Sequence, residues 1–450
     1  MNLQNIRKIN LVGDLHLGIK NNSVEWLEIQ KQFLLKFLFQ KVDEDFDQDR
    51  DILILEGDIF HSRESINVRI QNEAFAIFKQ LAAKFKRGVY IIVGNHDVYY
   101  KDKTEVNSLK ALSHLADNIH VFEKPETLNL NGEHSFLMLP WIEDVAEIRR
   151  RKADIAIIGA PFDDAVTHRP GTRFGPRAIR EAQYQTGTLH SLQVGVEPFT
   201  ALTAVDAGDA VVYPGRLEHG HGAIYRKVRE VAETGAIPIV LGGDHSITWP
   251  NATAIAEMRW PQRIGILHFD AHADASIDGY GSLHSHGSPM RRLIESGAVL
   301  GKNFVQVGLR GYFPDSETLG WMREHGMRSH FMTEIEERGS EAVIATAIAE
   351  ALDGPDAIWI SLDIDVVDPG LAPGTGTPEP GGMLSRELLR GLRQIAAQVP
   401  IAGMDIVEVS PPYDWAESTA MIANRAALEV ISALAKRKES GETIRWEPSR

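Results

Sequence analysis

Apolar runs alternate with amphipathic stretches in a regular order along residues 153–438. The apolar runs predict strands within residues 154–163, 201–209, 237–246, 263–274, 304–311, 357–369 and 401–411. The amphipathic stretches predict helices within residues 222–235, 289–297, 316–326, 341–354, 385–398 and 418–438. Short apolar strands that alternate with helices are typical of a parallel sheet covered on both faces. We therefore expect a three-layer αβα fold with a mostly parallel sheet over these residues.

Residues 1 to about 145 carry a second, shorter pattern of the same kind. Strands are predicted within residues 8–14, 51–58 and 89–97, with helices within residues 25–42 and 72–85 between them. This order predicts another parallel sheet, separate from the first.

Composition changes where these two patterns meet. Residues 1–150 contain 12 Asn, 12 Lys, 2 Pro and 7 Arg, whereas residues 151–450 contain 3 Asn, 5 Lys, 19 Pro and 23 Arg. One packed domain has no physical reason to exchange Lys for Arg at a single point. We expect separately derived domains over 1–145 and 153–438, a boundary between 140 and 153, and a polar tail over 439–450. Natural fusion, an engineered chimera and an assembly error all predict this pattern.

Charge and composition exclude several classes of protein. A net charge of −15 argues against a general nucleic-acid binder, which would concentrate Lys and Arg on one face. The absence of cysteine excludes disulfides, thiolate metal sites and a cysteine nucleophile. No apolar run reaches about 18 residues, and the amino terminus enters a strand without a signal-peptide core. We expect a cytoplasmic protein with no membrane segment.

Polar side chains gather where three strands of the longer segment end. They occur in GGDHS (242–246), in DAHAD (270–274) and in SLDIDVVDP (361–369). Side chains two apart in an extended chain face the same way, so we expect Asp270, His272 and Asp274 to point into one volume, and Asp363 and Asp365 into one volume. The carboxyl edge of an open α/β sheet is where ligands bind.

Six of these side chains are suitable metal ligands, namely His245, Asp270, His272, Asp274, Asp363 and Asp365. Four carboxylates with two imidazoles favour Mn²⁺ over Ni²⁺ or Zn²⁺. Four carboxylates gathered without a cation would repel one another, and two divalent ions offset that charge.

GGDHS, DAHAD and SLDIDVVDP in this order resemble the ureohydrolases, the arginase and agmatinase family. GAPFD (159–163), RPGTRFGPRAIREA (169–182) and GTGTPEPGG (374–382) resemble the agmatinase branch. The resemblance implies one Mn²⁺ held by His245, Asp270, Asp274 and Asp363, and a second held by His272, Asp270, Asp363 and Asp365. It also implies that water between the two ions becomes the nucleophile, which attacks a guanidinium carbon.

The same resemblance implies three catalytic residues. Glu408 would grip the guanidinium, Asp274 would relay the proton from the nucleophile, and His286 would deliver a proton to the leaving amine. His284, two residues away, is an alternative to His286. The expected products are urea and an amine.

Residues 275–283 (ASIDGYGSL) differ from the loop with which arginases hold an amino-acid head group, and this favours agmatine, cleaved to putrescine, over arginine. Guanidinobutyrate, guanidinopropionate and other small guanidines stay open. Arg291 or Arg292 can meet a substrate carboxylate or face solvent. The family usually forms trimers or hexamers, so a homo-oligomer is expected.

The strand ends of residues 1–145 carry GDLHLG (13–18), GDIF (57–60) and GNHD (94–97), which resemble the calcineurin-like metallophosphoesterases and most of all their recombination-exonuclease branch. The resemblance implies metal ligands at Asp14, His16, Asp58 and Asn95, with His96 assisting the leaving group, on half of an αββα sandwich.

The later histidine motifs of that family are absent, and EHGH (218–221), the nearest string, is expected in a solvated loop. We expect a truncated segment with half of its sheet uncovered and a vestigial site. A phosphodiesterase or DNA exonuclease subunit, and an appendage that alters assembly, are the competing hypotheses.

Overall fold

The computed structural model describes residues 2–43, 45–61, 66–94, 96–100, 103–132, 134–138, 148–149, 151–183, 189–261 and 263–446. The chain forms two compact units, Met1–Asp144 and Val145–Arg450.

The second unit is built on an eight-stranded sheet in which all neighbouring strands are parallel. Its strands are β10 (Ile155–Gly159), β11 (Ala204–Asp209), β12 (Ile237–Leu241), β13 (Ile264–Phe269), β14 (Phe304–Leu309), β15 (Arg328–Phe331), β16 (Ala357–Asp363) and β17 (Ile401–Val407). They lie in the order β11-β10-β12-β17-β16-β13-β14-β15. Parallel pairing brings all carboxyl ends to one edge, which fixes where a site can form.

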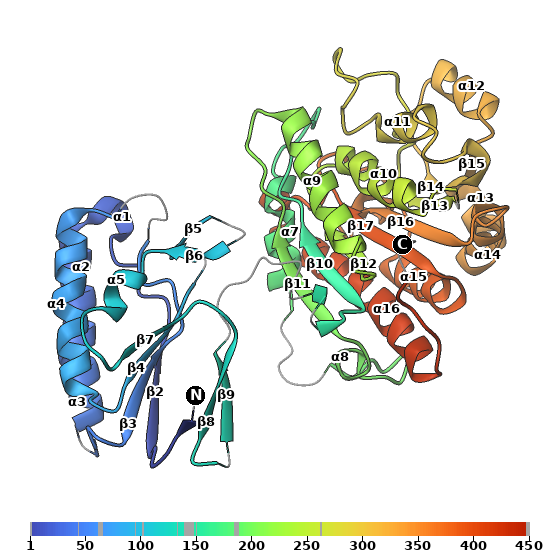
Figure 1. Ribbon diagram of the computed structural model, residues 1–450. Helices are drawn as coiled ribbons and strands as arrows, with labels where there is room; N and C mark the ends of the chain where they lie inside the picture. The colour runs from blue at the N-terminus through green and yellow to red at the C-terminus, as the bar shows by residue number, and fades with distance from the viewer. Residues whose placement is uncertain are drawn as a thin grey trace. The chain divides into compact units, whose positions relative to one another are not determined.

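Helices cover both faces of this sheet (Figure 1). Alternate strand residues divide between the two faces: Ile358, Ile360 and Leu362 of β16 belong to one apolar cluster, whereas Ala357 and Trp359 belong to the other. The first cluster is completed by α14 (Ser340–Ala351), α15 (Ser385–Gln398) and α16 (Ser418–Glu439), and the second by α9 (Leu217–Ala232), α10 (Thr248–Arg259) and α11 (Pro289–Glu295). The expected three-layer αβα fold is confirmed.

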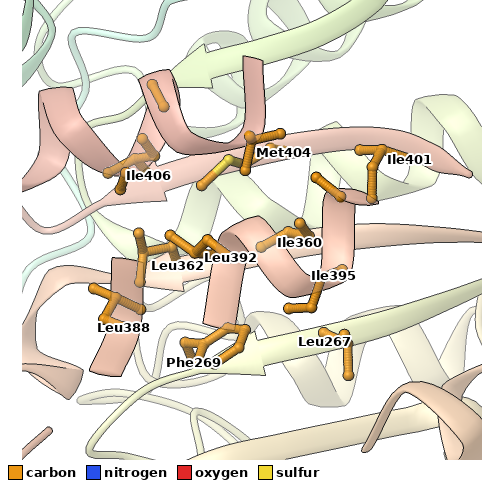
Figure 2. Close-up of a cluster of buried hydrophobic side chains, with 14 of the residues drawn as sticks. Leu267, Phe269, Ile360, Leu362, Leu388, Leu392, Ile395, Ile401, Met404 and Ile406 are labelled. Atoms are coloured by element: carbon orange, nitrogen blue, oxygen red, sulfur yellow. The ribbon is translucent and has the colours of Figure 1, made fainter. Parts of the chain in front are cut away.

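Helix α15 illustrates how the apolar pattern positions the central strands. Its buried stripe of Leu388, Leu392 and Ile395 faces side chains of β13, β16 and β17, including Leu267, Phe269, Ile360, Leu362, Met404 and Ile406 (Figure 2). These residues are buried almost completely, and burial of each such side chain is worth about 1.5–3 kcal/mol. Packing against α15 therefore fixes the positions of the strands that carry the polar clusters.

Shorter elements complete the second unit. They are α7 (Gly175–Glu181), α8 (Pro198–Ala201), α12 (Ser316–Glu324), α13 (Met332–Arg338) and the 3₁₀ turns η2 (Thr172–Phe174), η3 (His245–Ile247), η4 (Gly301–Asn303), η5 (Ile364–Val366) and η6 (Pro411–Tyr413). Helix α16 ends at Glu439, and Trp446 packs against the second apolar cluster. No helix among the residues described here is long and apolar enough to cross a membrane.

The expectation of a solvated loop at residues 218–221 is wrong. Helix α9 begins at Leu217, so these residues form its first turns, and the side chain of His221 is only 3% exposed. His221 contacts the rings of Phe162, Trp249 and His284, and its Nε2 lies 2.8 Å from Ser246 Oγ. Two glycines and two histidines conceal the helical period here, because Gly220 is needed where Phe162 approaches.

The first unit contains a four-stranded parallel sheet in the order β2-β3-β4-β7. The strands are β2 (Lys8–Val12), β3 (Asp51–Leu55), β4 (Val89–Ile92) and β7 (Ile119–Phe122). One face is covered by α2 (Val24–Gln32), the π-helix η1 (Phe33–Phe37), α3 (Leu38–Asp43) and α4 (Val68–Lys84), with short α1 (Ile19–Asn22) and α5 (Lys110–Ser113) nearby (Figure 1).

The other face of this sheet is not left uncovered, contrary to the expectation from the sequence. A second sheet of β1 (Asn2–Leu3), β8 (Glu126–Leu130) and β9 (His134–Met138) packs there, in the order β1-β8-β9. Leu3, Leu128 and Leu130 bury themselves against Ile52 and Ile54 of β3. The chain thus builds a helix layer and two facing sheets, and a hairpin of β5 (Val98–Tyr100) and β6 (Lys103–Asn107) is added beside them.

Candidate metal centre and active site

Three parallel strands, β12, β13 and β16, deliver the polar clusters of the second unit to one edge of the sheet. Asp363 is the last residue of β16, Asp270 follows β13 directly, and His245 opens the 3₁₀ turn after β12. In the sheet, β16 lies beside β13 and is separated from β12 only by β17. The spacing of strand ends therefore brings side chains from distant parts of the chain together.

The six predicted ligands form two groups around Asp270. In the first group, His245 Nδ1 lies 3.0 Å from Asp270 Oδ2, 2.9 Å from Asp274 Oδ2 and 3.1 Å from Asp363 Oδ2. In the second group, His272 Nδ1 lies 3.0 Å from Asp365 Oδ2 and 3.5 Å from Asp270 Oδ1. Within each group the ligand atoms lie within 4.8 Å of one another.

Asp270 joins both groups, as a residue that bridges two ions must. Asp363 belongs to the first group only, so its bridging role stays a prediction. Two other strand-end aspartates bind backbone amides instead: Asp244 accepts from Ala165 and Ser246, and Asp368 accepts from Gly370, Gly381 and Gly382.

The prediction that these clusters lie on extended strands, with side chains two apart on the same face, is wrong. Strand β13 ends at Phe269, so Asp270, His272 and Asp274 lie in the following loop, and Asp274 adopts a left-handed backbone with φ of 47°. Asp365 lies in the 3₁₀ turn η5 after β16. Loop folding rather than strand alternation brings these side chains together, because the chain must turn away at the sheet edge.

Two buried residues fix the orientation of the ligands. His245 Nε2 lies 3.0 Å from Ser361 Oγ, and this contact directs Nδ1 toward the carboxylates. His268 Nε2 lies 2.7 Å from Asp270 Oδ2, and the Gln306 amide nitrogen lies 3.1 Å from His268 Nδ1. Because Gln306 donates to Nδ1, the ring proton of neutral His268 sits on Nε2 and is donated to Asp270. Ser361, His268 and Gln306 lie outside the motifs from which the site was predicted.

The residues present fit a divalent cation pair. His245 Nδ1 is buried and has no hydrogen-bond partner among the described residues, although three carboxylate oxygens lie close to it. Burial, together with the charges of Asp365 and Asp270, raises the pKa of Asp363 well above its ordinary value. A buried ring nitrogen without a partner is costly, and so is the repulsion among crowded carboxylates. A bound cation removes both costs, because it accepts the nitrogen lone pair and offsets the negative charge. Four carboxylates and two imidazoles suit Mn²⁺.

Glu408 and His286 form a buried pair beside this donor set. Glu408 follows β17, where it has a left-handed backbone with φ of 62°, and its Oε1 accepts from the His245 amide at 2.8 Å. His286 Nδ1 lies 2.9 Å from the same oxygen. Burial opposes protonation of His286, yet the charge of Glu408 outweighs it and raises the His286 pKa to about 9. Glu408 Oε2 stays buried and unpartnered among the described residues.

A cavity of about 520 Å³ opens onto His286 and part of the predicted ligand set. Its walls include His272, Asp274, His286 and Asp363, together with Thr167, His168, Arg169, Phe313, Asp315, Thr377 and Glu379. His284, the alternative to His286, stacks on Trp249 at 4.7 Å between ring centroids and does not line this cavity. Thr167, which the sequence reasoning missed, contacts His286 Nε2 through its hydroxyl at 2.6 Å.

Neither Arg291 nor Arg292 lines this cavity. Arg291 donates to the carbonyl of Ala275 and lies over the ring of Trp321, and Arg292 donates to the carbonyl of Ile277. Both guanidinium groups therefore hold the loop after Asp274 in place.

The first unit gathers part of its predicted site. Asp14, His16 and Asp58 present ligand atoms within 4.8 Å of one another, and His16, His61 and His96 do likewise. Asn95 lies outside the described residues. His61, which directly follows the GDIF motif, was not among the predicted site residues.

Two family models match the chain. The arginase family model matches residues 153–432, and the calcineurin-like phosphoesterase model matches residues 7–194. The matches overlap over residues 153–194, yet β10 of that stretch pairs with β11 and β12 of the eight-stranded sheet. The overlapping residues are therefore structurally part of the second unit.

Curated relatives align with most of their own length. Proclavaminate amidinohydrolase from Streptomyces clavuligerus is 37% identical over 64% of this chain and 90% of its own. Guanidinopropionase from Pseudomonas aeruginosa is 36% identical over 71% of this chain and 97% of its own.

Two solved structures also align with this chain over most of their own length. A hypothetical agmatinase from Burkholderia thailandensis has a TM-score of 0.60 and 30% identity, covering 70% of this chain and 96% of its own. A formiminoglutamase from Trypanosoma cruzi, described with Mn²⁺, has a TM-score of 0.58 and 26% identity, covering 63% of this chain and 94% of its own.

Proposed function

This chain belongs to the arginase family, and from that premise we propose that its second unit hydrolyses agmatine to putrescine and urea with the help of two Mn²⁺ ions. The single observation that supports this most is the ligand set around His245 Nδ1. This buried nitrogen faces three carboxylates and makes no hydrogen bond within the part of the chain that the structure describes. The Mn²⁺ in the description of the Trypanosoma cruzi formiminoglutamase supports the choice of metal.

His245, Asp270, Asp274 and Asp363 would hold one ion, and His272, Asp270, Asp363 and Asp365 the other. Such a pair, when bound, lowers the pKa of water toward neutrality and so supplies a nucleophile strong enough to attack a guanidinium carbon. Asp274 lines the cavity next to His245, where its carboxylate can take up the proton that the attacking water releases.

Glu408 orients the guanidinium in this proposal. Its Oε2 is buried and has no partner among the described residues, so it can accept a charge-assisted hydrogen bond from a planar guanidinium nitrogen. Oε1 is already held by the His245 amide and by His286, which keeps the carboxylate from turning. The substrate carbon is thereby positioned beside the ligand set.

His286 supplies the proton for the leaving amine. It lines the cavity together with Asp274, and Glu408 raises its pKa to about 9 against the effect of burial, so the ring carries a transferable proton at neutral pH. The bond from carbon to the amine nitrogen breaks as that nitrogen is protonated. Urea and the amine then leave separately.

Agmatine carries a primary ammonium at its distal end, and the cavity offers carboxylates for it. Asp315 and Glu379 both line the cavity. Neither Arg291 nor Arg292 is available there to meet an acid.

A guanidino acid is the second candidate substrate, because Arg169 and His168 also line the cavity. Guanidinopropionase is among the similar proteins, which favours the same alternative. The distal carboxylate of such a substrate would pair with Arg169, whose guanidinium lies over the Tyr413 ring at 5.2 Å.

A panel assay with two variants tests the substrate proposal. The Mn²⁺-loaded full chain is assayed for urea with agmatine, 4-guanidinobutyrate and 3-guanidinopropionate, and Asp315→Asn is compared with Arg169→Gln. The agmatine proposal expects the highest kcat/KM on agmatine and a loss of about tenfold in Asp315→Asn, equivalent to about 1.4 kcal/mol. Preference for an acid, with the loss in Arg169→Gln, would replace agmatine by a guanidino acid. A homo-oligomer stays a prediction, to be measured by light scattering on the same sample.

A further inference from the structure

Helix α2 and the π-helical turn η1 of the first unit carry apolar side chains on two faces. On the inner face, Leu27 and Leu34 are buried in the apolar cluster that joins the helices to the four-stranded sheet. On the outer face, Ile29 is 56% exposed, Phe33 41% and Phe37 52%. A surface helix normally turns one apolar stripe to its core and polar residues to solvent. A second apolar face therefore indicates an interaction surface.

The spacing of these exposed side chains places them in one row. Residues three or four apart along a helix lie on the same face, and Ile29, Phe33 and Phe37 follow one another at intervals of four. The rings of Phe33 and Phe37 stack with 5.7 Å between their centroids, so they form one continuous apolar surface. Trp26, which is 41% exposed, extends this surface toward the start of α2. These four residues form the outer row.

Charges of opposite sign lie near the two ends of the outer row. Glu25 lies in the first turn of α2, and Lys36 lies in η1. Both side chains are exposed, and neither forms an ion pair within the part of the chain that the structure describes. Lys31, between them, is already paired with Glu73 at 2.9 Å. When two such helices pack antiparallel, each end meets its opposite charge, whereas parallel packing would bring like charges together.

We propose that two copies of this chain associate through the outer row, with their helices antiparallel about a twofold axis near Lys31. Such an axis places residues at equal distances from the midpoint opposite one another. Ile29 of each copy then meets Phe33 of the other copy, and Glu25 of each copy meets Lys36 of the other. One register thus satisfies the apolar contacts and both charge pairs. This association does not depend on the function proposed for the second unit.

Chemical cross-linking of the full chain tests this proposal, because the chain has no cysteine and one introduced thiol is then the single reactive site. Gln32 is exposed and adjacent to the axis, so Gln32→Cys is the test variant, and Lys79→Cys, exposed on α4, is the matched control. A short bis-maleimide joins two thiols that lie close together. On a denaturing gel we expect covalent chain dimers from Gln32→Cys and about tenfold fewer from Lys79→Cys.

Charge reversal in the Gln32→Cys background identifies the occupant of this surface. Glu25→Lys and Lys36→Glu each bring like charges together twice, so each is expected to lower the dimer yield about threefold. The double variant exchanges the two signs in both copies and is expected to restore the yield, whereas a partner of another sequence keeps its own charges.

Two results would overturn the proposal. One is an equal dimer yield from Gln32→Cys and Lys79→Cys, because the outer row would then not bring two copies together. The other is a double variant that yields less than either single reversal, because the surface would then fit a different partner. Circular dichroism of every variant is expected to match that of wild type, since all the substituted side chains are exposed.

Discussion

The two units place metal-competent side chains in the same position, beyond the carboxyl ends of neighbouring parallel strands, but they surround them differently. In the second unit, His245, Asp270 and Asp365 are almost fully buried. Ser361 contacts the ring of His245, and His268 contacts the carboxylate of Asp270. In the first unit, Asp14 and His61 are exposed. The strand ends bring donors together in both, but burial and supporting contacts determine how rigidly the donors are held.

This difference also separates the chemistry of the two sites. Four carboxylates around two imidazoles, with Asp270, Asp363 and Asp365 buried, build up a negative charge that divalent cations offset well. The first unit gathers the carboxylates of Asp14 and Asp58 with the imidazoles of His16, His61 and His96, so its donor set carries less negative charge. The same edge of a parallel sheet therefore gathers different donor sets, depending on which residues follow the strands.

The largest effect is expected at Asp270, the residue common to both ligand groups of the second unit. Asp270→Asn should abolish urea production, by about a thousandfold or more, because both ions lose a charged ligand. Metal content measured by mass spectrometry should fall in parallel. Asp368→Asn is the matched control, since this aspartate binds backbone amides and should keep both metal and activity.

A smaller loss is expected when Glu408 loses its charge. Glu408→Gln should lower kcat/KM about a hundredfold, equivalent to about 2.7 kcal/mol, because the guanidinium loses a charge-assisted partner. Bound metal should stay at the wild-type level, since Glu408 contacts His245 only through its backbone amide. Steady-state assays measure kcat/KM, and mass spectrometry measures bound metal. An unchanged kcat/KM would contradict the proposed contact between Glu408 and the guanidinium.

The supporting contacts of the second unit are tested at His268. His268→Asn removes the donor to Asp270 Oδ2 and should weaken Mn²⁺ binding ten- to a hundredfold. Activity at saturating Mn²⁺ should change much less than the affinity. Metal-depleted protein is titrated with Mn²⁺ while urea production is measured. The midpoint of this curve gives the affinity for Mn²⁺, and its plateau gives the activity at saturating Mn²⁺. If the variant binds Mn²⁺ as tightly as wild type, burial alone holds Asp270 in position and the His268 contact is not needed.

The smallest effect concerns the pH dependence of stability through His221, which packs behind the ligand loop. Burial lowers the pKa of His221 to about 3 from its ordinary 6.5, so the folded protein keeps the ring neutral. The unfolded chain takes up a proton below pH 6.5, and the free energy of unfolding therefore falls as the pH falls, by about 2 kcal/mol between pH 7 and pH 5.

His221→Gln should lack this part of the decline. Denaturant unfolding of chelated wild type and variant at both pH values measures the difference. The variant will be less stable at pH 7, because ring packing against Phe162 and Trp249 is lost, but its curve should be flatter. Parallel curves for the two proteins would contradict the neutral buried ring.

Much of this arrangement can be predicted from the sequence, because apolar runs mark buried strands and polar residues just after them mark the sheet edge. That logic finds His245, Asp270 and Asp363. It fails for β15, whose residues Arg328–Phe331 lack an apolar run, and for α10, whose first turn holds Trp249 and Pro250.

The contacts behind the site are harder to foresee. His268, Gln306 and Ser361 sit inside strands, where a single polar residue looks like an interruption of the core. Only the register of the sheet reveals their role, because it pairs His268 with both Gln306 and Ser361. A polar residue in the middle of a buried strand is therefore the signal worth following.

The most direct test of the central claim is a titration of the chelated full chain with Mn²⁺, in which urea released from guanidino compounds is measured against metal bound. We predict no urea without metal, and activity that rises with bound Mn²⁺ and saturates at two ions per second unit. Urea production by the metal-free chain, or a fully loaded chain inert on every guanidino compound, would contradict it.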